Sequence, residues 1–75
     1  MEGWLIAPDR LWSVHFHKAA KNASNEVQVH VDHGRVAPGE QPVLMKSRRT
    51  MRYEDAVALW KQLQGYGWSI DTAAW

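Results

Sequence analysis

Hydrophobic and polar residues alternate along two stretches of the chain, and this pattern predicts two antiparallel strands. Between residues 11 and 17, Trp12, Val14 and Phe16 fall on one face of an extended chain, and polar residues fall on the other. Between residues 26 and 32, three valines alternate with polar residues in the same way. A period of two is typical of strands with one buried face. We therefore expect the two stretches to pair, with these apolar faces in the core.

Two further stretches extend the predicted sheet. Residues 4–7 form a short apolar run that ends at a Pro-Asp turn signal. Residues 43–46 begin another strand, which we expect to continue to Thr50 or Met51. Residues 18–25 are polar, and residues 33–42 contain two glycines and two prolines, so both segments are predicted to be loops.

Residues 53–65 have the pattern of an amphipathic helix. Its apolar residues recur at the spacing that forms one stripe, and they are Ala56, Leu59, Trp60 and Leu63. Gly65 and Gly67 follow, and either suits the left-handed conformation in which helices often end. The pattern leaves open whether Trp68 and Ile70 form a short last strand. The helix itself is the firmest prediction of the C-terminal half.

The order of these elements predicts an α+β protein. We expect an antiparallel sheet of three to four strands, in β-β-β-β-α order, with the C-terminal helix packed on one face. Residues 1–75 are predicted to form a single domain, with residues 71–75 as a frayed tail. The expected core brings the helix stripe onto the inward residues of the sheet, namely Trp12, Val14, Phe16, Val27, Val29 and Val31.

Composition restricts how this small domain can be stabilised and where it can work. The 75 residues include five tryptophans and no cysteine, so large rings rather than disulfides must supply the core. The net charge of +1 argues against a dedicated polyanion binder. The start of the chain has no secretory signal, and no apolar run is long enough to cross a bilayer. We expect a soluble, cytoplasmic protein without membrane contact.

A basic segment is the first candidate for a binding site. Its cations could neutralise the phosphates of a nucleic acid or another anion, and they are Lys46, Arg48, Arg49 and Arg52. The competing interpretation is a solvated sheet edge whose charges prevent the addition of another strand. Alternation along a strand would also place Arg49 on the face opposite to Lys46 and Arg48, so that only part of the segment converges.

Histidines form the second candidate. His15 and His17 project from the polar face of one strand, and a hairpin would place His30 across from them, on a face that also carries Asp32. Imidazoles and a carboxylate are zinc ligands. The sequence has no compact metal-binding signature, however. We therefore expect no metal and no cofactor, and name the three histidines as the residues that a metal would use.

Surplus aromatic residues favour a surface for a partner. Tyr66, Trp68 and Trp75 are the candidates for such a surface, although Trp68, like Trp4, is also explained by packing in the core. The chain has no cysteine nucleophile, no nucleophile elbow and no glycine-rich phosphate loop, so we expect no enzyme. The leading hypothesis is a non-enzymatic module that binds another protein or itself, and the alternative is nucleic-acid binding through residues 46–52.

The chain also resembles a family of short cyanobacterial proteins known only as a domain of unknown function. The resemblance runs from Gly3 to Trp68, and the spacing of its motifs is more specific than any single one. The residues that carry it are Gly3-Trp4-Leu5, Asp32-His33-Gly34-Arg35, Pro38-Gly39, the run from Pro42 to Arg49, Ala56, Leu59-Trp60, Leu63 and Gly67-Trp68. This resemblance implies a small bacterial protein that stands alone in the cytoplasm, and it implies no activity.

Overall fold

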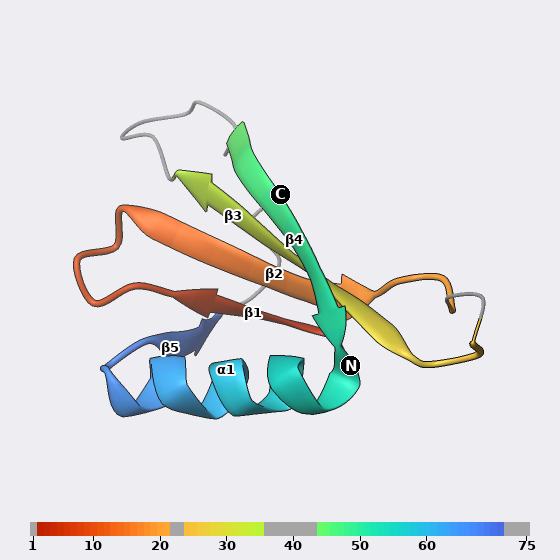
Figure 1. Ribbon diagram of the computed structural model, residues 1–75. Coiled ribbons are helices and arrows are strands. Elements are labelled where there is room, and N and C mark those ends of the chain that lie inside the picture. Colours follow the sequence, from red (N-terminus) through yellow and green to blue (C-terminus); the bar gives the residue numbers. More distant parts are fainter. Residues whose placement is uncertain (1, 22–23, 36–43, 72–75) are drawn as a thin grey trace.

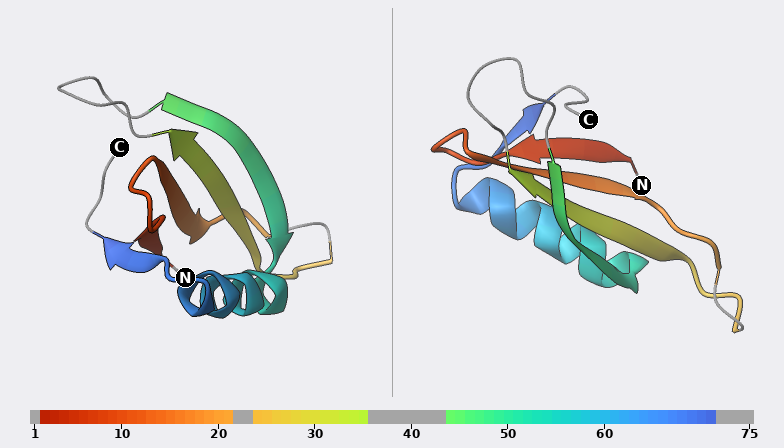
Figure 2. Two further views of the ribbon diagram at one scale, coloured as in Figure 1. Left: turned by 90° about the vertical axis from the view of Figure 1, so that its left-hand side faces the viewer. Right: turned by 90° about the horizontal axis from the view of Figure 1, so that it is seen from above.

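The described residues form a five-stranded antiparallel sheet with one helix (Figure 1). The computed structural model describes residues 2–21, 24–35 and 44–71. In chain order the elements are β1 (Gly3–Ile6), β2 (Trp12–Lys18), β3 (Gln28–Arg35), β4 (Leu44–Arg52), α1 (Tyr53–Gly65) and β5 (Ser69–Asp71). The strands lie in the order β4-β3-β2-β1-β5, so that β4 and β5 are the two edges. Figure 2 shows the sheet curving around α1, which covers its inner face.

The predicted α+β class and the C-terminal helix are confirmed, but the predicted number of strands is too small. The missing strand is β5, which pairs with β1 through Leu5 and Ile70 at its centre. Three residues are too few to show a period of two, so this strand depends on its pairing with β1 rather than on its own pattern. Asp71, which was expected to begin a frayed tail, is the last residue of β5. Residues 72–75 of the expected tail lie outside the described residues.

The predicted loop at residues 33–42 begins later than expected, because β3 continues to Arg35. A register shift between His33 and Gly34 interrupts its pairing with β4. Glycine inside a strand is a common mark of such an irregularity, since it has no side chain to place on either face. The extension therefore lengthens the pairing of β3 with β2 as far as Trp12 and Arg35.

The core lies between the inner face of the sheet and α1. Its fully buried members are Leu5, Val14, Phe16, Val29, Val31 and Ala56. The ring of Trp60 meets Phe16 edge to face, with the ring centroids 5.2 Å apart. Leu59, Trp60 and Leu63 pack against this cluster as predicted.

Two residues predicted to lie in the core do not belong to it. Val27 precedes β3 and is 39% exposed, because the alternation of the strand begins only at Gln28. Trp12 is half-buried at the start of β2, and the Arg35 guanidinium carbon lies 5.9 Å from its ring centroid. A cation above an indole face stabilises this arrangement outside the core.

The ends of α1 follow the sequence closely. Arg52 occupies the N-cap with an extended backbone and no capping side-chain hydrogen bond, as expected where no serine or aspartate precedes the helix. At the other end Gly67 has a φ of +96°. Its N–H donates to the carbonyl of Gln64, and the N–H of Trp68 donates to that of Leu63. These bonds end the helix and direct the chain into β5.

Candidate functional site

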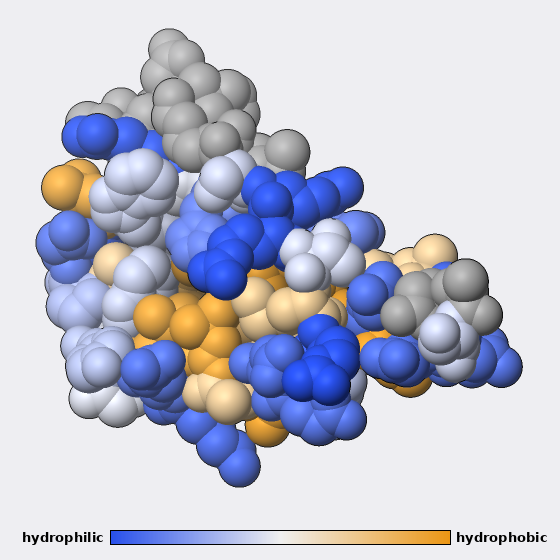
Figure 3. Space-filling model, viewed as in Figure 1, coloured by the Kyte–Doolittle hydropathy of each residue, from blue (hydrophilic) through white to orange (hydrophobic). Residues whose placement is uncertain are grey.

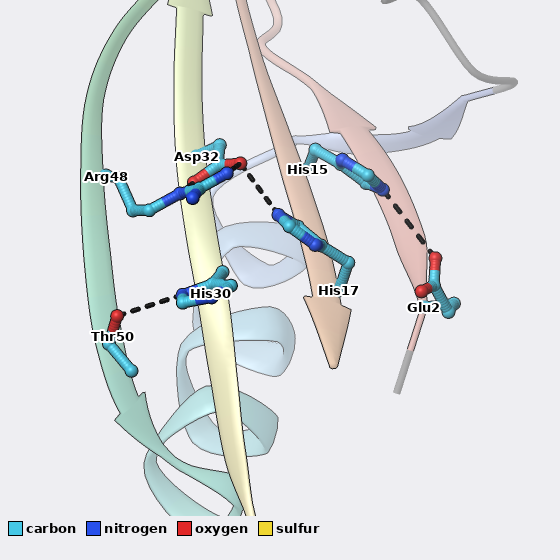
Figure 4. Close-up of polar contacts among 7 residues, drawn as sticks. All are labelled: Glu2, His15, His17, His30, Asp32, Arg48 and Thr50. Atoms are coloured by element: carbon cyan, nitrogen blue, oxygen red, sulfur yellow. Dashed lines mark hydrogen bonds and ion pairs between the residues drawn. The ribbon is translucent and has the colours of Figure 1, made fainter. Parts of the chain in front are cut away.

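Alternation along the strands places a set of polar and ring side chains on the face of the sheet that lies away from α1. Figure 4 shows the histidines and the polar side chains of this set in front of β2, β3 and β4, with the helix behind the sheet. We call this surface the open face, and its central members are Trp4, His15, His17, His30, Asp32, Arg48 and Thr50.

Asp32 is the centre of the open face. Its side chain is only 3% exposed, and it accepts hydrogen bonds from both neighbouring strands. Arg48 on β4 donates through Nε to Oδ1 at 2.7 Å and through Nη2 to Oδ2 at 2.9 Å. His17 on β2 lies with Nε2 2.7 Å from Oδ2. The Arg48 hydrogen bonds, with help from His17, outweigh the burial and lower the pKa of Asp32 to about 2.

Rings continue the open face across β1, β2 and β3. Trp4 and His15 stack with centroids 3.8 Å apart, and His15 stacks on His17 at 4.4 Å. His15 Nε2 also lies 3.6 Å from a carboxylate oxygen of Glu2. Burial and the neighbouring His17 lower the pKa of His15. Trp4 was predicted to lie in the core, but its position next to the buried Leu5 on β1 places it on the open face.

The structure selects a different set of possible metal ligands from the three predicted histidines. One ligand atom each from His15, His17 and Asp32 lie within 4.8 Å of one another. His30 lies opposite His17 in the pairing of β2 with β3, but its Nδ1 makes a 2.9 Å hydrogen bond with the Thr50 hydroxyl. The sequence pattern had placed Asp32 on this face without selecting it as a site residue.

The predicted basic segment is divided between surfaces. Arg48 binds Asp32 on the open face, whereas Arg49 lines a hollow on the helix side of β4. Arg52 lies with its Nε 3.5 Å from a carboxylate oxygen of Asp55, one turn into α1. The side chain of Lys46 lies outside the described part of the structure. The described arginines therefore do not converge on one point.

A hollow of about 310 Å³ lies between β4 and α1, and we call it the β4–α1 groove. Its lining combines apolar and charged side chains, namely Arg49, Met51, Asp55, Ala58, Leu59 and Gln62. Figure 3 shows a hydrophobic area between the positions of β4 and α1, with hydrophilic surface around it. Met51 and Leu59 form the floor of the groove, and both side chains pack against the hydrophobic core.

A second hollow of about 450 Å³ lies at the start of α1 and includes the exposed Val27 and Tyr53. Of the predicted partner-surface residues, Tyr66 is 68% exposed, Trp68 packs against the core, and Trp75 lies outside the described residues. The exposed Ile70 on β5, which the sequence analysis had not selected, lies close to Tyr66 in the chain.

These features define a small α+β protein in which one helix covers a single face of an antiparallel sheet. The model of the family described as "Protein of unknown function (DUF1651)" matches residues 2–75, and the chain belongs to that family. The resemblance to a family of unknown function is thereby confirmed. No curated protein and no solved structure matches the chain. Among the described residues, α1 is neither long nor apolar enough to cross a membrane.

Proposed function

We propose that the protein is a non-enzymatic binding module that takes up an extended segment of another polypeptide along β4. The observation that carries this proposal is the β4–α1 groove, a hollow that lies beside an edge strand and combines apolar and charged lining residues. Domains that recognise peptides by strand addition combine these two features. The edge supplies main-chain hydrogen bonds, and the hollow receives side chains.

The edge of β4 suits strand addition. β4 is nine residues long, contains no proline, and pairs with β3 on one side only in the described part of the chain. An edge of this length presents a row of backbone donors and acceptors to an incoming strand. Exposed arginines on β4 restrict which segments can add, because they favour partners that carry acidic groups.

The groove supplies the second half of the recognition. Met51 and Leu59 form an apolar floor, and Arg49 and Asp55 place charges of both signs around it. An apolar centre with a polar rim is the usual anatomy of a protein interface. A volume of about 310 Å³ accommodates one or two side chains of a bound segment. Alternate residues of an added strand point to the same face, so such side chains can enter together.

A library of displayed random peptides provides the test. Peptides selected on the wild-type protein should bind Ala58→Arg about tenfold more weakly, since Ala58 is exposed on α1 and lines the groove. Gln64→Arg is the matched control on an exposed position outside that lining, and it should change affinity by less than about twofold. Amide NMR shifts on peptide addition should follow β4. Failure to enrich any peptide, or shifts that avoid β4 and α1, would reject the proposal.

Self-association would use the same edge, with a second copy of β4 as the added strand. Light scattering over a range of concentrations distinguishes this form from binding to a different protein. A mass that rises with concentration in the wild-type protein, and not in Ala58→Arg, supports the self-associating form. A cyanobacterial origin and a cytoplasmic location are parts of the proposal, and they come from the sequence alone.

Nucleic-acid binding is the second candidate. It rests on the exposure of Arg48 and Arg49 on an edge strand. It ranks lower because Arg48 is already bound to Asp32, Arg52 lies beside Asp55, and Arg49 faces the other side of β4. Titration with single- and double-stranded oligonucleotides at two salt concentrations tests it. Phosphate binding must weaken as the salt concentration rises.

A further inference from the structure

The open face holds a group of side chains that the proposed peptide site does not use. His15 and His17 occupy alternate positions of β2, so that their rings leave the same face of the strand. Asp32 lies directly opposite His15 on β3. Donor atoms of the three residues approach within 4.8 Å of one another, and Figure 4 shows the rings and the carboxylate on one side of the sheet.

We infer that His15, His17 and Asp32 form a binding site for a zinc-type divalent cation. Imidazole nitrogens and a carboxylate oxygen are the donors that such ions take in proteins, at about 2.0–2.2 Å. An ion at the centre of a group 4.8 Å across needs only small side-chain movements to reach all three donors. Glu2 extends an exposed carboxylate to within 3.6 Å of His15 Nε2, and it can supply a fourth ligand.

The hydrogen bonds around Asp32 agree with this role. The ionised carboxylate only accepts, so His17 Nε2 carries the proton in their 2.7 Å contact. Binding of the cation between these two atoms replaces that proton, which moves to Nδ1 or leaves to solvent. Arg48 then keeps its hydrogen bonds to the carboxylate from the outside. Such an outer partner fixes the orientation of a ligand and is a regular feature of metal sites.

The donor set also determines which cations fit. Two imidazoles favour zinc, copper or nickel, whereas magnesium and calcium require oxygen ligands almost throughout. His30 does not belong to the group of donors that lie within 4.8 Å of one another, and its Nδ1 makes a hydrogen bond with the Thr50 hydroxyl. It therefore serves as a matched control, since it is a histidine on the same face, opposite His17 in the sheet.

Titration of the untagged protein with Zn²⁺, followed by calorimetry and by thermal unfolding, tests the inference. The wild-type protein should bind one ion per chain and unfold at a higher temperature with Zn²⁺, and Mg²⁺ should have no effect. His15→Gln should weaken Zn²⁺ binding by more than about tenfold, whereas His30→Gln should change it by less than about twofold. Circular dichroism verifies that both variants fold.

Imidazole nitrogen NMR of the wild-type protein gives a measurement that needs no variant. Addition of Zn²⁺ should shift the ring nitrogens of His15 and His17 and leave those of His30 in place. Shifts centred on His30 or His33, equal loss of binding in both variants, or no saturable binding at millimolar Zn²⁺ would overturn the inference. None of these results depends on peptide binding at the β4–α1 groove.

Discussion

Replacement of Asp32 by asparagine measures how much the buried carboxylate contributes to stability. The change preserves shape and removes the charge that Arg48 and His17 bind. The pKa of Asp32 is about 2 in the folded protein instead of 3.8, and each pKa unit corresponds to about 1.4 kcal/mol. The Arg48 side chain is 46% exposed, so solvent screens part of this interaction. We expect Asp32→Asn to lower the free energy of unfolding by about 1–2 kcal/mol at neutral pH.

The pH dependence of this loss has a definite sign. Folding depresses the pKa of Asp32, so the folded protein holds the ionised form more strongly than the unfolded chain does. The contribution of Asp32 is therefore complete above pH 3.8 and is lost as the pH falls toward about 2. The difference in stability between wild type and Asp32→Asn should shrink over this window, because a protonated aspartic acid resembles asparagine.

Urea unfolding followed by tryptophan fluorescence, in buffer with a chelator, gives both free energies at each pH. Asp55→Asn is the control, since it removes the same carboxylate charge from an exposed ion pair, that of Asp55 with Arg52. We expect that variant to stay within about 0.5 kcal/mol of wild type. The reasoning is refuted if Asp32→Asn is as stable as wild type at neutral pH. It is also refuted if the difference between them does not change down to the lowest pH at which the wild type folds.

Three further predictions concern packing, backbone and burial. Gly3→Ala should lower the free energy of unfolding by about 1–3 kcal/mol in a thermal melt, because a Cβ there would lie 2.6 Å from the Trp60 ring. Gly67→Ala should cost about 1–2 kcal/mol in the same assay, since its φ is +96°, whereas Gly65→Ala, which meets nothing within 4 Å, should not destabilise the protein. Burial lowers the pKa of His33 from 6.5, so wild-type stability should fall as the pH drops below 6.5, with a shallower slope in His33→Gln by urea unfolding.

Much of the fold could be predicted because apolar and polar residues alternate along the long strands. In β2 and β3 the apolar positions Val14, Phe16, Val29 and Val31 are buried as expected. The pattern fails at strand ends: Trp12 at the start of β2 is half-buried, and Val27, which lies just before β3, is 39% exposed. A strand as short as β5 shows no alternation of apolar and polar residues, and its pairing with β1 determines that it is a strand.

The candidate sites were harder to predict because they depend on which residues face each other across strands. The connection from β2 to β3 is short, so a hairpin could be predicted from the sequence, with His30 across from His15 and His17. Asp32 and Arg48 are 16 residues apart in the chain, and the register between β3 and β4 decides that they meet. The groove depends on how α1 packs beside β4, and the local pattern of apolar and polar residues does not determine that packing. The sequence therefore indicated the histidines and Arg48 as candidates, but it did not show that Asp32 and Arg48 pair or that a groove forms beside Arg49.

The position of Asp32 between two strands has a consequence for the alignment of the sheet. A slip of one residue would move every apolar side chain to the wrong face, so the hydrophobic pattern already excludes it. A slip of two residues keeps all faces correct, and hydrophobicity alone barely opposes it. Such a slip between β3 and β4 would move Arg48 out of the position opposite Asp32 and break its hydrogen bonds to a carboxylate that is only 3% exposed. The Asp32 carboxylate thus favours the observed alignment of β3 and β4 over others that bury the same valines.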